Sequence, residues 1–300
     1  MEISGLLLSY IAVLGFILGF VVSKTNFCTM GAVSDWVNIG DLSRFKSWMF
    51  AAAIAILGVT VFEFQSYFDL NDSRIPYRNS VFSWPRYILG GLMFGVGMTY
   101  ASGCGNKVLI RIGGGNLKSI VVLLIAGLMA YIMTRTDFYG IIFHSWMNPI
   151  SPDLAKLGIE DQSLPTIISL IISSANTLYY KLTVGLLVGF SFMYYIFRSG
   201  SFIKNIDNVI GGFIVGSVVV LAWYLTGSTL GEEWIETNNF LDNPLPGVGI
   251  QSFTFINPMG ESIIYFGKSA DIYYLTFGVT ALLSVILGSF VYSVISRNFR

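Results

Sequence analysis

Seven apolar stretches, each close to the length that crosses a lipid bilayer, constrain this chain more than any other feature. A helix of roughly 20 apolar residues spans the hydrocarbon core, and only helices or closed barrels satisfy their backbone hydrogen bonds there. Hydrophobic residues make up 54% of the 300 residues and charged residues only 11%. The sequence therefore predicts an all-α polytopic membrane protein with a single transmembrane domain over residues 1–300. The predicted spans are residues 3–23, 45–66, 87–103, 117–135, 182–198, 208–227 and 272–295.

The charged residues between these spans alternate in sign and predict an orientation. The segments 24–46, 107–118 and 198–204 and the C-terminus are basic, whereas the segments 136–163 and 228–271 are acidic. Because basic loops stay in the cytoplasm, we expect a multi-pass protein of the cell inner membrane with its N-terminus outside and its C-terminus in the cytoplasm. Three arginines between residues 67 and 86 oppose this orientation.

Composition excludes several functional classes. The formal net charge is zero, which gives no indication of a nucleic-acid partner. The single histidine, His144, excludes a multi-histidine metal site and a Ser-His-Asp triad, so we expect no metal, no cofactor and no enzyme of these kinds. Two cysteines are too few for a disulfide framework. The first span follows Glu2 rather than a basic segment, which indicates a retained helix and not a cleaved signal.

A glycine-rich break separates two spans between residues 90 and 129. The sequence Ser102-Gly103-Cys104-Gly105-Asn106 ends one apolar run, and Gly113-Gly114-Gly115 precedes the next. Glycine lets backbone segments approach closely, and non-helical backbone at membrane depth occurs only where it is buried in protein or lines a polar cavity. We therefore predict a substrate-binding site at this break. Its candidate residues are Gly103, Cys104, Gly105 and Asn106.

Simpler interpretations stand beside this one. A cysteine in a membrane helix is more often a small packing residue than a ligand, although the flanking glycines favour a site at Cys104. Lys107, Arg111 and Lys118 are expected to be loop residues that set topology, with attraction of anions as a secondary role that stays open. Asn106 and Asn116 either cap helices or contact substrate. The glycine triplet lacks the context of a phosphate loop. The motifs Gly91-x-x-x-Gly95 and Gly212-x-x-x-Gly216 are predicted to pack helices.

Two further segments are apolar but too short to span. Residues 26–38 and 251–260 each combine Asn or Thr with phenylalanines and a Met-Gly pair, and each follows a glycine-bearing span. This pattern predicts re-entrant half-helices that enter from opposite faces and meet near the middle, as in an inverted repeat. The first repeat would cover residues 1–135 and the second, incomplete one residues 182–300. The short run 166–173 is predicted to be re-entrant or interfacial.

Three stretches, FCTMGAVSDW, GGLMFGVGMTYASGCGN and RIGGGNLKSIVVLLIAGLMAY, resemble the YeeE/YedE family of membrane transporters, which take up thiosulfate or related sulfur compounds. The resemblance covers most of the chain. It implies a helix bundle pinched to an hourglass, with cysteines near the pinch that pass thiosulfate by S–H hydrogen bonds. Cys28 and Cys104 match two of these positions. Full-length relatives continue into a further span with a third Gly-Cys motif, which we expect to have no counterpart within residues 1–300.

The predicted function is uptake of thiosulfate or a related small sulfur anion. Neutral donors suit a dianion, because a buried lysine would hold it too tightly, whereas a thiol in apolar surroundings stays protonated and donates weakly. Helix N-termini add positive potential without a full charge. One alternative is a membrane sulfurtransferase that carries a persulfide on Cys104, which requires a nearby base or cation. Another is a non-transporting subunit or remnant. A sulfurtransferase partner on the cytoplasmic side is a further expectation.

Overall fold

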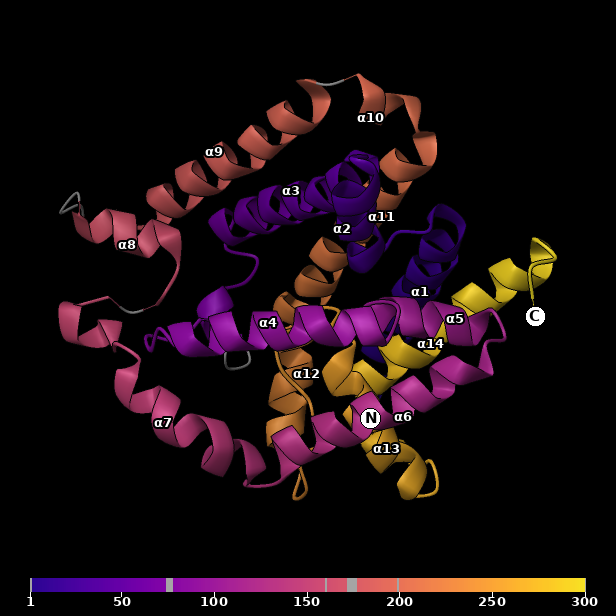
Figure 1. The fold of residues 1–300 in the computed structure, drawn as a ribbon. Coiled ribbons are helices and arrows are strands. Elements are labelled where there is room, and N and C mark those ends of the chain that lie inside the picture. The colour runs from indigo at the N-terminus through magenta and orange to yellow at the C-terminus, as the bar shows by residue number, and fades with distance from the viewer. Residues whose placement is uncertain (1, 74–77, 160, 172–176, 199, 300) are drawn as a thin grey trace.

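The computed structural model describes residues 2–73, 78–159, 161–171, 177–198 and 200–299, and helices dominate this part of the chain (Figure 1). Within it, seven regions are long and apolar enough to cross a membrane, as predicted. Each contains one long helix, and α14 begins later than predicted because a 3₁₀ turn at Ile272–Tyr274 precedes it. The long helices are α1 (Glu2–Thr25), α3 (Ser43–Phe64), α4 (Trp84–Tyr100), α6 (Leu117–Arg135), α9 (Thr177–Arg198), α11 (Ile206–Gly227) and α14 (Phe277–Ile295).

Shorter helices connect the long ones. They are α2 (Thr29–Ile39), α5 (Gly105–Gly113), α7 (Ser145–Met147), α8 (Leu164–Ile171), α10 (Ser201–Lys204), α12 (Thr229–Asn239) and α13 (Ile256–Gly267). The two short segments predicted at residues 26–38 and 251–260 contain most of α2 and the start of α13. α8 covers the predicted short run as far as residue 171, and residues 172 and 173 lie outside the described residues. The internal repeat itself stays a prediction.

Helix α1 packs against α14 in the centre of the bundle through closely spaced backbones. A Cβ on Gly19 would lie 2.1 Å from the Val285 carbonyl oxygen, and a Cβ on Gly288 would lie 2.0 Å from that of Phe16. Small residues at such crossings let membrane helices approach, because lipid provides no hydrophobic drive to pull them together. The buried core beside this contact contains Leu18, Val22, Val108, Leu109, Ile110, Val218, Met259, Leu282 and Val285.

Of the two glycine motifs predicted to pack helices, one contacts another helix and the other does not. Gly212 and Gly216 of α11 press against α3, where an added Cβ would lie 2.7 Å and 2.6 Å from carbonyl oxygens of that helix. The prediction for Gly91 and Gly95 of α4 is wrong, because an added Cβ there would meet nothing within 4 Å. Apolar side chains of α4 such as Leu92 are more than half exposed. Since lipid tails are as apolar as leucine, this exposed helix face suits contact with lipid.

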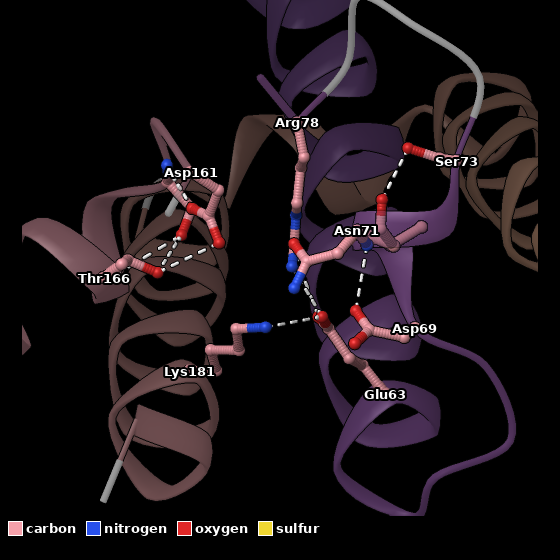
Figure 2. A network of polar contacts seen from close by, with 10 residues as sticks. Glu63, Asp69, Asn71, Ser73, Arg78, Asp161, Thr166 and Lys181 are labelled. Atoms are coloured by element: carbon pink, nitrogen blue, oxygen red, sulfur yellow. Dashed lines mark hydrogen bonds and ion pairs between the residues drawn. The ribbon is translucent and has the colours of Figure 1, made fainter. Parts of the chain in front are cut away.

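Helix α3 lies between α11 and the outer helix α9, and an ionic cluster closes one end of this layer (Figure 1, Figure 2). Glu63, near the end of α3, is only 8% exposed. Its two carboxylate oxygens accept hydrogen bonds from the Arg78 guanidinium at 2.6 Å and 3.0 Å, and Lys181 of α9 donates to the same carboxylate at 3.3 Å. We call Glu63, Arg78 and Lys181 the Glu63 clamp. It ties the loop after α3 to two helices.

A second acidic side chain beside the clamp is buried at the start of α8. Asp161 accepts hydrogen bonds from the Ser163 backbone at 2.7 Å and from the Thr166 hydroxyl at 3.1 Å (Figure 2). Burial opposes its ionisation, but the hydrogen bonds from Ser163 and the charge of Arg78 together hold the pKa of Asp161 below its usual range. This carboxylate therefore stabilises the fold fully above the ordinary aspartate pKa, and that contribution is lost as the pH falls through the lowered value.

Candidate functional site

The two cysteines occupy the same local structure in different parts of the chain. Cys28 is the N-cap of α2 and Cys104 is the N-cap of α5, both with extended backbone. Two residues before each cysteine the chain adopts left-handed backbone, with φ of 53° at Asn26 and 55° at Ser102. Each turn ends a long helix and begins a short one. The first N–H groups of the short helices therefore lack partners within their own helix.

The two thiols lie next to each other as free cysteines. The sulfur of Cys28 lies close to the backbone N–H groups of Gly31 and Cys104, and the sulfur of Cys104 lies close to those of Lys107 and Thr29. Neither thiol makes a strict capping hydrogen bond. Each sulfur thus faces the positive end of its own helix and that of the other cysteine's helix, where backbone N–H groups favour an anion.

A cavity of about 250 Å³ lies where three short helices begin, and we call it the central chamber. Cys28, Cys104 and Phe255 are the N-caps of α2, α5 and α13. The helices approach closely at Gly105, where an added Cβ would lie 2.9 Å from Ile256 Cδ1. The chamber is lined by Phe27, Cys28, Thr29, Phe94, Cys104, Gly105, Asn106, Val215, Phe255 and Ile256. None of these lining residues carries a charged side chain, so the polarity of the chamber comes from two thiols, one hydroxyl, one amide and the backbone.

A larger cavity of about 590 Å³ shares Cys28 with the central chamber, and we call it the basic vestibule. Four cationic side chains and two carboxylates line it, so its net charge favours anions. Its lining residues are Lys24, Thr25, Asn26, Cys28, Met30, Gly31, Asp41, Arg44, Ser102, Lys107, Arg111, Asn205, Asp207 and Asn208. Cys28 therefore lies at the boundary between a charged cavity and a neutral one.

Two cations hold the left-handed turn before Cys28. Lys107 Nζ donates to Asn26 Oδ1 at 3.0 Å, and Arg44 donates to the Asn26 carbonyl at 2.7 Å. Arg44 also pairs with Asp35 of α2 at 2.9 Å. A side chain at Gly31 would collide with this guanidinium, since an added Cβ would lie 2.7 Å from it. Side chains from α3 and α5 thus fix the turn.

The prediction that Lys107, Arg111 and Lys118 are loop residues is wrong. Lys118 belongs to α6, whereas Lys107 and Arg111 belong to α5 and line the basic vestibule. The pattern of apolar residues around them is that of a short amphipathic helix, in which Val108, Leu109 and Ile110 are buried. Because a cation inside the fold is what a persulfide mechanism needs, this correction removes one argument against the sulfurtransferase alternative.

The two asparagines, whose roles the sequence left open, differ. Asn116 is the N-cap of α6, and its side chain accepts from the Lys118 backbone at 3.1 Å. Asn106 lies in the first turn of α5, at the chamber wall, and its Oδ1 atom is buried without a hydrogen-bond partner in the described part of the chain. A buried polar atom without a partner is costly. Asn106 therefore has hydrogen-bonding capacity to offer a ligand.

The structure brings together four of the five predicted site residues. Cys28, Cys104, Gly105 and Asn106 line the central chamber, but Gly103 lines neither cavity. Gly103 instead lies in the break before α5 and packs against that helix, since an added Cβ would lie 2.9 Å from Lys107 Cβ. Sequence reasoning missed Phe94, Val215 and Asn26 as lining residues. The position of Asn26, two residues before a cysteine like Ser102, is a signal that could have identified it.

Comparisons with known proteins identify the family of this chain. A family model described as sulphur transport matches residues 24–300. The thiosulfate transporter TsuA of Escherichia coli (strain K12) is 23% identical over 295 residues, which cover 95% of this chain and 74% of the relative. The thiosulfate transporter TsuA of Spirochaeta thermophila is 26% identical over 149 residues, which cover 50% of this chain and 42% of the relative. The resemblance predicted from sequence is confirmed, and the chain belongs to the sulphur transport family of membrane proteins.

Proposed function

We propose that this protein takes up thiosulfate, or a sulfur oxyanion of similar size and charge, and that Cys28 and Cys104 pass it through the central chamber by S–H hydrogen bonds. The observation that carries the proposal is the meeting of two cysteine-capped helix N-termini, with a third N-terminus, at one chamber. The names of the two TsuA relatives support the choice of substrate.

The charge distribution suits a dianion that must be released again. The basic vestibule attracts anions with full charges, whereas the chamber offers only dipoles and weak donors. A lysine at the chamber would bind a dianion strongly and would be costly to keep in the membrane. Thiols donate weakly, and partial charges at helix N-termini favour an anion without trapping it.

The adjacent thiols suit transfer from one donor to the next. Because Cys28 borders both cavities and Cys104 borders the chamber alone, they form successive stations on one route. Asn106 adds a third neutral group. Its unpartnered amide end can present an N–H donor after rotation about its last bond, since the two ends of an amide have nearly the same shape.

Under the positive-inside rule, the four cationic side chains of the vestibule support an orientation in which that cavity faces the cytoplasm. In this orientation the N-terminus lies outside, and the vestibule is the exit of the route. A cytoplasmic sulfurtransferase partner would receive the transported sulfur anion there. The orientation and this partner are part of the proposal.

A second candidate function is a membrane sulfurtransferase with a persulfide on Cys28 or Cys104. The proximity of Lys107 to the two thiols favours it, because a cation stabilises a thiolate nucleophile. The two mechanisms differ in what serine can do. A serine hydroxyl donates a hydrogen bond but cannot carry a sulfane sulfur.

Uptake of radiolabelled thiosulfate into proteoliposomes tests the proposal. We expect uptake by the unmodified chain, a severe loss in Cys104→Ala and partial uptake in Cys104→Ser. Leu92→Ala on the exposed face of α4 is the control, with normal uptake expected. Equal and complete loss in Ala and Ser variants, together with a persulfide found by mass spectrometry, would favour the sulfurtransferase. Absence of uptake by the well-folded unmodified chain would refute transport by residues 1–300 alone.

A further inference from the structure

Helix α13 carries a buried carboxylate that the proposed passage of thiosulfate does not use. Glu261 is 7% exposed. Among the described residues no Lys, Arg or His forms an ion pair with it, whereas the equally buried Glu63 pairs with two cations. Ionisable side chains within membrane proteins are costly and usually functional. Glu261 therefore needs an explanation other than ion pairing.

Neutral groups satisfy both oxygens of this carboxylate. Asn257 Nδ2 donates to one oxygen at 2.9 Å, and the Thr276 hydroxyl donates to the other. The Thr276 oxygen also accepts from the Val279 backbone at 3.2 Å, so the hydroxyl hydrogen is directed at the carboxylate. Gly278 leaves the space that the carboxylate occupies, because a Cβ there would lie 2.7 Å from Glu261 Oε2. The site therefore encloses one carboxyl group between two neutral donors.

Glu261 lies between the central chamber and the face opposite the basic vestibule. Its partner Asn257 directly follows Ile256, which lines the chamber. On its other side is a small cavity of about 70 Å³ lined by Arg135, Pro246, Glu261, Ile264, Tyr274 and Thr276. Arg135 ends α6 and is exposed, whereas the start of α6 follows the vestibule helix α5. A helix of this length spans about 28 Å at 1.5 Å per residue, so the two cavities open toward opposite faces.

The titratable groups around Glu261 are few. Arg135 of α6 and Tyr274 of the 3₁₀ turn share its cavity, and Tyr131 of α6 approaches the neighbouring Gly260 through its backbone. At the start of α14, Thr276 and Gly278 contact the carboxylate, and on α13 itself Asn257 does. A proton is the ligand that fits one carboxylate with two neutral donors, since Na⁺ or Ca²⁺ would need more oxygen ligands. The described residues also hold no cluster of metal-ligating side chains.

We propose that Glu261 is a proton-binding site that couples proton entry to substrate uptake. This inference rests on the proposed transport of a sulfur dianion. In each cycle the carboxylate takes one proton from the outer water through the small cavity to become a neutral carboxylic acid, and it later releases that proton toward the inside. No other bond forms or breaks. One proton carried with each dianion reduces the charge moved inward from two negative charges to one.

The link to the chamber is the hydrogen bond from Asn257. Protonation of the oxygen that accepts from Asn257 weakens that oxygen as an acceptor, and Asn257 lies one residue from the chamber wall. The first turn of α13 would then shift, and with it the positions of Phe255 and Ile256 at the chamber wall. Occupancy of the chamber and protonation of Glu261 would affect each other, as linked binding requires.

Proteoliposomes with the full chain test the coupling. Initial uptake of radiolabelled thiosulfate is measured with acidic outer buffer and neutral lumen, and again with equal pH on both sides. We expect the ratio of these rates to be several-fold above one in the unmodified chain and to fall to one with a proton ionophore. Glu261→Gln should lower the ratio to one, and the exposed Glu233→Gln on α12 should leave it raised. A raised ratio in Glu261→Gln, or a ratio of one in the unmodified chain, would overturn the proposal.

A second measurement separates this site from the transport function. Infrared difference spectra on acidification should show the carbonyl band of a protonated carboxylic acid that Glu261→Gln lacks. This band supports the proton site even where no thiosulfate uptake is found, in which case only the proposed function fails. If Glu261→Gln does not fold, Thr276→Val is used instead. It removes a donor to the charged carboxylate, so the band should appear with less acidification. An unchanged band in Thr276→Val would contradict the assignment to Glu261.

Discussion

The Glu63 clamp and the central chamber are both buried and polar, but they differ in how completely their polar groups are hydrogen-bonded. In the clamp, both oxygens of Glu63 accept from Arg78, and Lys181 adds a third donor (Figure 2). In the chamber, two thiols face each other and backbone N–H groups without strict capping hydrogen bonds, and the buried oxygen of Asn106 has no partner among the described residues. The clamp is complete in itself, whereas the chamber keeps bonding capacity for a ligand.

This difference predicts which variants should lower the free energy of unfolding and which should lower uptake. Removing one partner of a buried ion pair leaves an uncompensated charge and costs about 3–5 kcal/mol. Removing a thiol leaves no unpaired charge. A hydrogen bond to an ionic substrate is worth about 1.5–3 kcal/mol. Variants in the clamp should therefore lose stability, and variants in the chamber should lose uptake.

The largest effect is expected at the clamp. Arg78→Ala leaves Glu63 buried with Lys181 alone, so we expect a destabilisation of about 3 kcal/mol. Thermal or denaturant unfolding in detergent measures it. Uptake per folded molecule should stay normal, because neither cavity on the route contains Arg78. Unchanged unfolding would show that the clamp does not contribute as its geometry indicates.

Cys104→Ala should have the opposite effect to Arg78→Ala, with uptake lost and stability kept. Loss of one donor to a dianion predicts a fall in uptake of about 10- to 100-fold. The unfolding midpoint should change little, since alanine keeps most of the volume. If Cys28 is the second station, Cys28→Ala should also lose uptake severely, and Cys28→Ser should keep part of it. Normal uptake by Cys104→Ala would break the comparison, because the chamber would then resemble an ordinary packing region.

Gly105→Ala tests the width of the chamber. The added Cβ would lie 2.9 Å from Ile256 Cδ1 and 3.3 Å from Phe255 Cβ, so α13 must shift where it lines the chamber. We expect uptake to fall several-fold, with a stability loss of about 1 kcal/mol from overpacking. Gly97→Ala is the matched control on α4, since nothing lies within 4 Å of its added Cβ. Equal effects in the two variants would contradict the close approach of α5 and α13.

The smallest effect is expected in the basic vestibule. Arg111→Ala removes one of four cations that line it, so we expect uptake to fall about twofold at low ionic strength. The loss should disappear at high salt, because salt screens the attraction of an open charged cavity for an anion. Uptake rates at several salt concentrations measure this. A loss that does not depend on salt would instead indicate direct binding at Arg111.

Several features of the site could be predicted because they depend on local sequence. Gly103-Cys104-Gly105 ends a long apolar run, and this alone indicated the helix break at which α5 begins. The location of Lys107 and Arg111 in a loop was predicted wrongly, because a basic segment between two spans resembles a loop in sequence. Whether such a segment forms a helix depends on burial of Val108 and Leu109 against other helices, which a single sequence does not display.

Packing partners were less predictable than helices. Gly91-x-x-x-Gly95 and Gly212-x-x-x-Gly216 have the same spacing, yet only the second pair contacts another helix. The matching turns at Asn26 and Ser102 were missed because their sequences share little besides the cysteine two residues later. A left-handed residue is a property of backbone geometry, and several residue types can adopt it.

The sequence by itself determined the spanning helices, the family and the positions of both cysteines, because a span depends only on the apolar character of about 20 consecutive residues. Only the tertiary structure decided that Cys28, Cys104 and the start of α13 meet in one chamber, and that Glu261 has neutral partners while Glu63 has charged ones. These contacts join residues from distant parts of the chain. They follow from how α1, α11 and α14 pack, and close packing depends on the shapes of all partners together.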